Sequence, residues 1–149
     1  MSKPALRLLL SFIICHFSFS SVAAQDSTAF RAYLYNQEYD VYMRINFYRQ
    51  NIIVPWQQLF GEMPGYLSRE GSMYCWLVAS VELKDERTAL LEMVNDYGSE
   101  DLTAQLTQDN DSVYTLRCLN GSPLKMPKDK KWQKLPKQLT FIRKAKPVR

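Results

Sequence analysis

Histidine is nearly absent from this sequence, and its scarcity excludes whole classes of chemistry. The single histidine, His16, lies within the first 24 residues, a segment that we expect to be removed. A mature chain without imidazole has neither Ser-His-Asp nor Cys-His catalytic machinery. With two cysteines and no histidine it also lacks the ligands of the usual four-ligand zinc site, and no glycine-rich phosphate loop is present. We therefore expect no cofactor and favour a protein that is not an enzyme.

Long apolar runs are also missing. The one notable run, Leu8–Phe19, follows the basic residues Lys3 and Arg7 and precedes several small residues, which is the arrangement of a secretory signal peptide. We predict cleavage after Ala24 and a periplasmic or secreted location. No later stretch approaches the roughly 20 apolar residues that a membrane-spanning helix needs, so no transmembrane segment is expected.

The remaining chain, 125 of the 149 residues, suffices for one domain. We expect a single domain over residues 25–144 and a disordered basic tail at 145–149. Charge is distributed unevenly: nine acids and two bases lie in Glu82–Asp111, whereas eleven bases and one acid lie in Arg117–Arg149. A basic segment can bind nucleic acid or an anionic membrane. For an exported chain we favour a solvated basic segment and expect no nucleic-acid partner.

Cysteine is scarce, and removal of Cys15 would leave the pair Cys75 and Cys118. In an oxidising compartment an even pair predicts a disulfide. The chain-entropy model gives roughly 4 kcal/mol for closing a loop of this length. Two buried free thiols are the alternative.

The stretch Met73–Leu83 is the clearest central strand, because it is rich in β-branched and aromatic residues and free of glycine and proline. Successive side chains of a strand point to opposite faces. We expect the apolar phase to point inward and to contain Met73, Cys75, Leu77, Ala79, Val81 and Leu83. The opposite phase contains Tyr74, Trp76, Val78, Ser80 and Glu82.

Other strands follow from alternation and from turn residues. Glu38–Tyr48 alternates as a half-buried strand, Asn51–Val54 is a short strand, and Leu139–Arg143 is the last strand. Leu59–Leu67 contains two glycines and a proline, so we expect a kinked strand or a loop. Asp26–Asn36 fits either a short capped helix or an edge strand, and we leave both open.

Loop lengths that keep apolar residues on one face predict the pairing of the later strands. A loop of residues 84–86 places Val81 opposite Ala89, and a loop of residues 109–111 places Leu106 opposite Tyr114. A bulged turn at Asn120-Gly121 places Leu116 beside Leu124, and residues 127–138 form an extended connection. About eight antiparallel strands predict an all-β up-and-down meander that closes into a barrel, since closure removes exposed edges. A two-sheet sandwich is the alternative.

Aromatic residues concentrate in the first half of the mature chain, where they fill a core or line a binding cavity. The candidate ligand or partner contacts are Tyr42, Tyr48, Trp56, Glu62, Tyr66, Trp76, Lys130, Lys131 and Trp132. Two weaker interpretations use acids. Glu62 with Asp96, Glu100 or Asp101 could form a hydrolase pair about 5 to 10 Å apart, and the last three could bind calcium, although an ordinary turn explains them more simply.

Five stretches carry a resemblance: 39–42, 54–55, 60–66, 95–104 and 132–137, which include Phe60-Gly61-Glu62-Met63-Pro64-Gly65-Tyr66 and Asn95-Asp96-Tyr97-Gly98-Ser99. Together they resemble small secreted bacterial proteins of unknown function, and the general pattern is similar to lipocalin-like (calycin) barrels, without their Gly-x-Trp motif. The resemblance implies a Gram-negative envelope or secreted location. It carries over no catalytic residue.

The favoured hypothesis is therefore a non-catalytic exported barrel that binds a small apolar or amphipathic ligand or an envelope component. A barrel filled by Met43, Leu77, Leu91 and Leu116 would argue against an internal ligand cavity. The alternative is a protein-binding module, such as an inhibitor or an envelope assembly factor. A carboxylate-based hydrolase is the least favoured.

Overall fold

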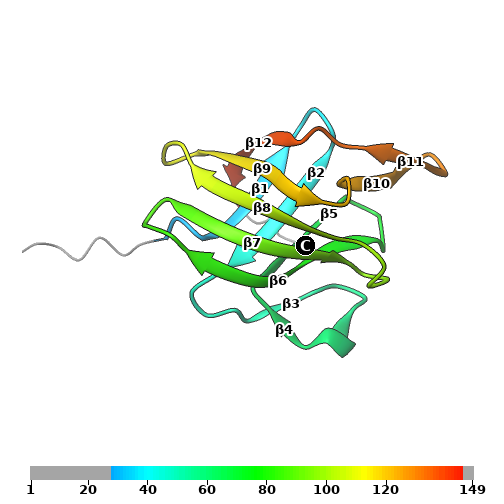
Figure 1. Cartoon of the computed structure of the whole chain (residues 1–149), viewed down its shortest axis with the longest axis horizontal. Coiled ribbons are helices and arrows are strands. Elements are labelled where there is room, and N and C mark those ends of the chain that lie inside the picture. Colours follow the sequence, from blue (N-terminus) through cyan, green and yellow to red (C-terminus); the bar gives the residue numbers. More distant parts are fainter. Residues whose placement is uncertain (1–27, 146–149) are drawn as a thin grey trace, which may run out of the picture.

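Eight antiparallel strands close into a barrel in the computed structural model, which describes residues 28–145 (Figure 1). Around the barrel the strands follow the order β1-β12-β9-β8-β7-β6-β5-β2. Their bounds are β1 Arg31–Asn36, β2 Val41–Asn46, β5 Gly65–Ser68, β6 Cys75–Leu83, β7 Thr88–Asn95, β8 Asp101–Gln108, β9 Val113–Gly121 and β12 Gln138–Lys144. The all-β barrel is thus confirmed, and the sandwich alternative is excluded.

Closure depends on β1, which pairs with β2 on one side and with the last strand, β12, on the other. The N-terminal segment is therefore a strand, and of the two alternatives the helix is wrong. Beside this seam the guanidinium of Arg143 donates to the hydroxyl of Tyr114 and to the carbonyl of Thr28 at 3.1 Å. The Tyr114 hydroxyl in turn donates to the carbonyl of Ala29 at 2.6 Å. These bonds connect the two ends of the barrel chain.

The interior is filled by large side chains from all eight strands and from the turn before β1. Those with almost no exposure include Phe30, Leu34, Met43, Leu67, Trp76, Leu91, Leu106, Tyr114, Leu116 and Phe141. The alternation predicted in Glu38–Tyr48 is confirmed, because Val41, Met43, Ile45 and Phe47 all belong to this cluster. Burial of this apolar area is the main source of stability.

Strand β6 differs from the prediction in the direction of its side chains. Trp76 and Val78 point into the barrel, whereas Cys75 and Leu77 belong to a separate cluster on the outer wall. The cause is a bulge between Val78 and Ser80, where the register with β7 shifts. A bulge inserts one residue and so reverses the alternation. Cys75, Leu77 and Val81 were expected to share one inward phase. That expectation is correct only on the C-terminal side of the bulge, where Val81 packs against the interior.

The expected disulfide is wrong for the same reason. Cys75 lies on the outer wall, Cys118 packs against the interior cluster, and both thiols are free. Cys118 lies on β9 with its side chain toward the interior, so once the bulge in β6 has turned Cys75 outward the two sulfurs lie on opposite faces of the barrel wall.

Two predicted hairpin registers are displaced by two residues, although both loops have the expected odd length. Ala89 pairs with Leu83 rather than with Val81, and Leu106 pairs with Leu116 rather than with Tyr114. In each case the loop lies one residue later, because Lys84 and Asp109 extend the ladder through bonds to the carbonyls of Thr88 and Val113. Such a shift of two keeps the same side chains inward, so apolar patterning alone cannot detect it.

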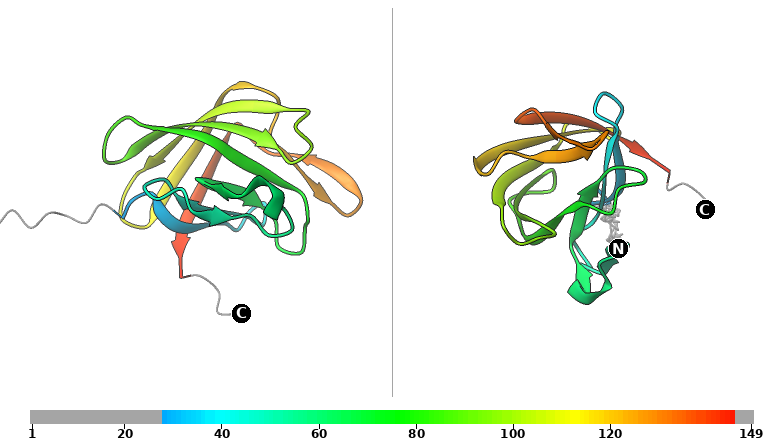
Figure 2. Two further views of the ribbon diagram at one scale, coloured as in Figure 1. Left: turned by 90° about the horizontal axis from the view of Figure 1, so that it is seen from below. Right: turned by 90° about the vertical axis from the view of Figure 1, so that its right-hand side faces the viewer.

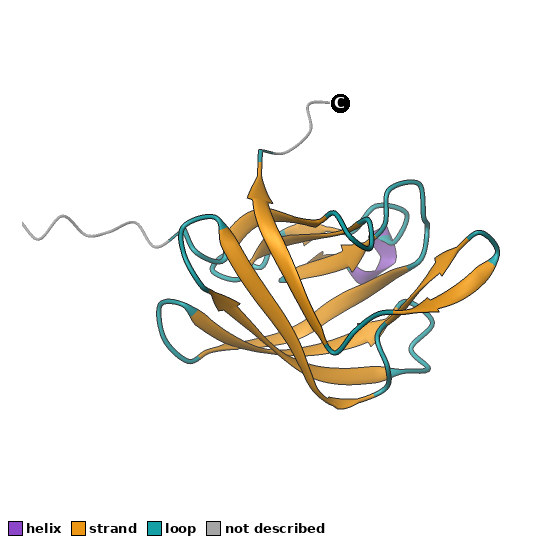
Figure 3. Cartoon of the chain, turned by 90° about the horizontal axis from the view of Figure 1, so that it is seen from above, coloured by secondary structure: helices purple, strands orange, loops and turns teal. Residues whose placement is uncertain are grey.

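Two excursions interrupt the barrel. Residues 51–64 form the flap, with β3 (Ile52–Ile53), a 3-10 turn (Gln58–Phe60) and β4 (Glu62–Met63). The flap confirms the predicted short strand and the kinked segment. Figure 3, coloured by secondary structure, shows this turn as the only helical piece of the described residues.

Residues 125–134 form the second excursion, the lysine hairpin, made of β10 (Lys125–Lys128) and β11 (Lys131–Lys134). It corrects two predictions: residues 127–138 are not simply extended, and β9 does not pair with Leu124 across a turn at Asn120-Gly121. Instead β9 continues along β8 to Gly121 and also pairs with β12, where Leu116 faces Leu139. The views in Figure 2 show the lysine hairpin projecting from one end of the barrel.

Within residues 28–145 no helix is long and apolar enough to cross a membrane. The predicted signal peptide and the predicted tail, apart from Ala145, lie outside the described residues.

Candidate functional site

The barrel interior does not provide the ligand site that its architecture first suggests. Met43, Leu91 and Leu116 fill it together with Trp76, each with at most 1% exposure. Leu77, expected beside them, lies on the outer wall instead. A candidate ligand site must therefore be sought on the outside of the barrel.

The outer wall carries a cleft of about 310 Å³ between the barrel and the flap. Its wall side comes from β2, β5 and β6, and its cover comes from the end of β3 and the residues that follow. The lining side chains are Tyr42, Tyr66, Ser68 and Cys75 from the wall, Val54, Pro55 and Trp56 from the flap, and the turn of residues 69–73. Three of the aromatic residues predicted as contacts thus meet in one place.

The flap is held against the wall by apolar packing. Ile52 and Val54 are buried against Tyr66, Cys75 and Leu77, so the outward side chains of β5 and β6 form a second, smaller core. One side-chain bond adds to it, from the amide of Gln57 to the Asp96 carboxylate at 3.2 Å. The flap therefore has a defined position over the cleft.

Gly65 allows the chain to pass from the flap into the barrel. A Cβ atom at this position would lie 2.5 Å from the carbonyl oxygen of Arg44, closer than any side chain permits. The bond from the Asn46 amide to the Pro64 carbonyl, at 2.9 Å, fixes the same crossing. The glycine predicted as part of a kink is thus a point of close backbone approach.

The wall of the cleft is a group of tyrosines. The Tyr42 ring stacks on Tyr33 with centroids 5.4 Å apart and meets the edge of Tyr66 at 5.8 Å. Burial raises the pKa of Tyr66 well above its ordinary value, and the hydrogen bond with the neighbouring Tyr42 hydroxyl raises it further. The Tyr66 hydroxyl is therefore neutral at physiological pH, and the wall offers apolar ring faces with hydrogen-bonding edges.

Trp56 overhangs the cleft with an unusual backbone. Its side chain is 68% exposed, and its φ of 66° lies in the left-handed region. For a residue with a Cβ this conformation costs roughly 1 to 2 kcal/mol. An exposed indole on strained backbone at a cleft is the combination expected of a functional contact.

Cys75 lies in the lining but is not a nucleophile. Burial, followed by the neighbouring Asp96 carboxylate, raises the pKa of its thiol to about 12. The reactive form of cysteine is the thiolate, so the cleft holds a protonated, inert sulfur.

Arg69 is a residue that sequence reasoning missed. It is only 8% exposed, and its guanidinium donates to the Tyr39 carbonyl at 2.8 Å, to the Gln133 amide oxygen at 2.6 Å and to the Pro127 carbonyl. Among residues 28–145 it meets no carboxylate side chain. Arg69 joins the rim of the cleft to the lysine hairpin; in the sequence it looked like part of an ordinary turn, which gave no signal.

Two of the three predicted aromatic contacts that lie outside the cleft are Trp76 and Tyr48. Trp76 is inside the barrel, where its indole N–H donates to the Lys125 carbonyl at 3.0 Å. The hydroxyl of Tyr48 accepts a bond from the Phe30 amide at 3.2 Å. Neither side chain lines the cleft, because the bulge in β6 turned Trp76 inward and Tyr48 follows the end of β2.

The candidate acids have separate roles. Asp96 accepts from Gln57, Glu100 pairs with Lys125 at 2.9 Å, and Glu62 and Asp101 are exposed on β4 and β8. Within the part of the chain that the structure describes, no group of three or more His, Cys, Asp or Glu residues could hold a metal ion. Lys130, Lys131 and Trp132 lie together on the lysine hairpin, away from the cleft lining.

These features define a class: a closed eight-stranded antiparallel barrel with a filled interior and an aromatic cleft on its outer wall. No protein-family model matches the chain, and neither curated proteins nor solved structures give a significant match.

Proposed function

We propose that this protein is a non-catalytic binding protein of the cell envelope, and that its outer cleft binds a small amphipathic molecule. The observation that carries the proposal is the meeting of Tyr42, Tyr66 and exposed Trp56 around one cleft, while the barrel interior is filled. A cleft of about 310 Å³ lies at the lower end of the usual range for small-molecule sites.

The chemistry of the lining indicates the chemistry of the ligand. Tyr42 and Trp56 both line the cleft, so a flat apolar group bound there can contact aromatic rings, while tyrosine hydroxyls at the wall can bond a polar substituent. The turn of residues 69–73 adds one carboxylate, that of Glu70, to the lining, and the part of the lining from β2, β5 and β6 contains none. The ligand class is therefore an amphipathic molecule with a planar or ring-shaped apolar part.

A binding role fits the residues better than catalysis does. The Cys75 thiol is protonated, and the candidate acids make separate contacts instead of forming a facing pair. An envelope location is supported by the signal-peptide pattern of residues 1–24 and by the resemblance to secreted bacterial proteins with a lipocalin-like pattern.

Native mass spectrometry of the mature protein, purified from the envelope of its own host, is the most direct test. We expect a bound small molecule that is lost on denaturation. Recovery of only the bare protein at several envelope preparations would contradict the proposal.

A probe experiment localises the site. Anilinonaphthalene sulfonate, a planar amphipathic fluorophore, should bind the native protein, and Tyr42→Ala and Trp56→Ala should each weaken binding by about tenfold, as loss of an aromatic contact does. Tyr97→Ala, at an exposed aromatic residue outside the cleft, is the matched control and should leave the affinity unchanged. Equal affinities in all three variants would place the probe elsewhere.

The protein-binding module remains a second candidate because of the tip of the flap. Leu59 is fully exposed, and Ile53 and Phe60 are about half exposed. Exposed apolar groups gathered on one projection are typical of protein contacts. A Leu59→Ser, Phe60→Ser variant that lost an envelope partner in a cross-linking experiment but kept the fluorescent probe would favour this candidate.

A further inference from the structure

The lysine hairpin concentrates positive charge, and the nearby acids Asp40 and Glu70, which line a hollow with Lys128 and Lys130, form no ion pair with it. It contains five lysines and one acid, Asp129, in ten residues. Lys125 pairs with Glu100 at 2.9 Å. For the other four lysines, none of the described residues supplies an ion-pair partner. The resulting positive electrostatic field can attract an anionic partner outside the molecule.

The register of the hairpin places like charges directly opposite each other. Lys128 faces Lys131, and Lys125 faces Lys134. Opposed like charges destabilise a strand pair, so folding alone gives no reason for this arrangement. An anionic partner would remove the repulsion.

The hairpin is nevertheless held firmly at its base. Met126 is completely buried, and Arg69 donates to the Pro127 carbonyl and to the side chain of Gln133. Trp76 donates from the barrel interior to the Lys125 carbonyl. The distal charges are thus presented on a rigid support instead of a loose tail.

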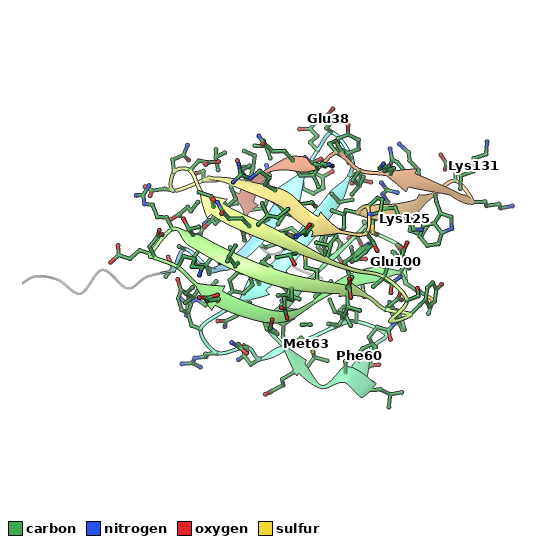
Figure 4. All side chains as sticks on the ribbon, viewed as in Figure 1. Glu38, Phe60, Met63, Glu100, Lys125 and Lys131 are labelled. Carbon is green, nitrogen blue, oxygen red and sulfur yellow. The ribbon has the colours of Figure 1, made fainter. Side chains whose placement is uncertain are left out.

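The distal end combines charge with an aromatic ring. Lys131 is the outermost labelled residue on this side of the molecule, and Lys125 and Glu100 lie at the base (Figure 4). Trp132 follows Lys131, is 53% exposed and rests on Tyr74, with ring centroids 4.9 Å apart. Lysines flanked by a half-exposed tryptophan match the headgroup region of a bilayer, where indole rings concentrate.

We propose that the lysine hairpin docks the protein onto an anionic lipid bilayer, with Lys128, Lys130 and Lys131 at the headgroups. The alternation of side chains puts Lys128 and Lys131 on one face of the hairpin and Lys125, Lys134 and Trp132 on the other, with Lys130 in the turn. A single anionic polymer strand bound along one face of the hairpin would leave the lysines of the other face without a partner. A flat bilayer surface that touches the tip of the hairpin brings Lys128, Lys130 and Lys131 within one Debye length, about 8 to 10 Å, of the charged headgroups.

None of the three docking lysines lines the outer cleft, and docking does not require the proposed ligand. Each lysine near an anionic membrane surface contributes about fivefold in affinity, from roughly 1 kcal/mol per charge. Loss of two lysines should therefore weaken binding by about 25-fold.

Co-sedimentation of the mature protein with lipid vesicles tests the proposal. We expect binding to phosphatidylcholine vesicles that contain about one third phosphatidylglycerol, none to pure phosphatidylcholine, and a steep loss with added salt. Lys128→Gln combined with Lys131→Gln should reduce binding by about 25-fold. Lys84→Gln combined with Arg87→Gln removes the same charge from another turn and should leave binding nearly unchanged.

Two further variants sharpen the result. Asp129→Asn removes the acid at the tip and suits its left-handed backbone, φ 51°, so it should strengthen binding by about fivefold. Trp132→Phe should abolish the blue shift of tryptophan emission that accompanies docking.

Three results would overturn the proposal: vesicle binding unchanged in the Lys128 and Lys131 variant, equal weakening in the Lys84 and Arg87 control, or binding to soluble heparin that outcompetes vesicles of equal charge concentration. The last result would show a preference for an anionic polysaccharide. Trp56→Ala should dock normally, so failure of the cleft proposal and failure of this one can be told apart.

Discussion

At the scale of single residues, the environment of a side chain decided its role more than its type did. Cys75 illustrates this. In the sequence it looked like half of a disulfide, yet in the fold it is buried beneath the flap with a protonated thiol. Its chemistry follows from desolvation, which disfavours the charged thiolate.

The pKa of Cys75 makes a prediction about reactivity. With a pKa of about 12, roughly one thiol in ten thousand is ionised at pH 8. We expect native Cys75 to react with iodoacetamide far more slowly than the same cysteine in urea, at a rate that rises about tenfold per pH unit. Mass spectrometry of digested protein measures this, and labelling at equal rates in both conditions would contradict it.

The raised pKa of Cys75 also makes the stability of the folded protein depend on pH. The pKa is raised in the folded state above its ordinary value of 9.0, so the folded protein holds the thiol proton more tightly than the unfolded chain does. The resulting stability is complete below about pH 9 and is lost as pH rises toward 12. Between pH 8 and pH 10.5, the free energy of unfolding measured with urea should fall less for Cys75→Ala than for the natural chain.

Arg69 supports a third prediction at this scale. Arg69→Met removes the donors to Tyr39, Pro127 and Gln133 and leaves buried acceptors unpaired, which should lower the free energy of unfolding by about 2 to 4 kcal/mol. Hydrogen exchange should also accelerate in residues 125–134. Arg87→Met, at an exposed loop position, should change stability by less than about 0.5 kcal/mol.

At the scale of elements, alternation located the strands but could not locate irregularities within them. The eleven-residue stretch that became β6 was recognised, and so were the central strand β2 and the last strand β12. The bulge between Val78 and Ser80 was not, because no glycine or proline marks it. One inserted residue therefore reversed the predicted directions of Cys75, Trp76 and Leu77.

Gly65 gives a prediction about the joint between the flap and the barrel. Gly65→Ala should cost about 1 to 3 kcal/mol, because its Cβ would clash with the backbone of Arg44 and separate β5 from β2. It should also weaken probe binding in the cleft. Gly71→Ala, where nothing lies within 4 Å but φ is 74°, should cost only about 1 kcal/mol; an equal loss in both variants would contradict the steric explanation.

At the scale of the whole molecule, the packing of large side chains decided where a cleft forms. A closed barrel suggested an internal cavity, but Trp76 and its neighbours fill the interior. The outer wall gained a second core beneath the flap, and with it a cleft. The barrel serves as a rigid support whose two excursions carry the candidate binding surfaces.

Trp76 provides the corresponding test. Trp76→Ala should open a cavity in the barrel and lower the free energy of unfolding by about 3 to 5 kcal/mol. The enlarged interior should then take up an apolar probe such as benzene, which the natural protein excludes. Calorimetric binding of benzene to the natural protein would show that its interior is not filled.

The candidate site was only partly predictable. Tyr42, Trp56 and Tyr66 were identified from their aromatic concentration, and the structure brings them to one cleft. Arg69 and Cys75 were not placed there, because each depends on a contact between distant segments. Arg69 bonds to residues 58 and 64 positions later in the chain, and sequence spacing carries no signal for such a contact.

The sequence by itself determined that this chain is all-β and barrel-forming, because period-two alternation and short polar turns act within a few residues. It also places no histidine after residue 16, so a chain cleaved at the predicted position after Ala24 would contain no imidazole. Only the tertiary structure decided which face of β6 is inside, that the two thiols stay apart, and that the candidate cleft lies outside the barrel. Those outcomes depend on one bulge and on how side chains from strands that are distant in the sequence fill the interior. Neither leaves a recognisable pattern in the local sequence.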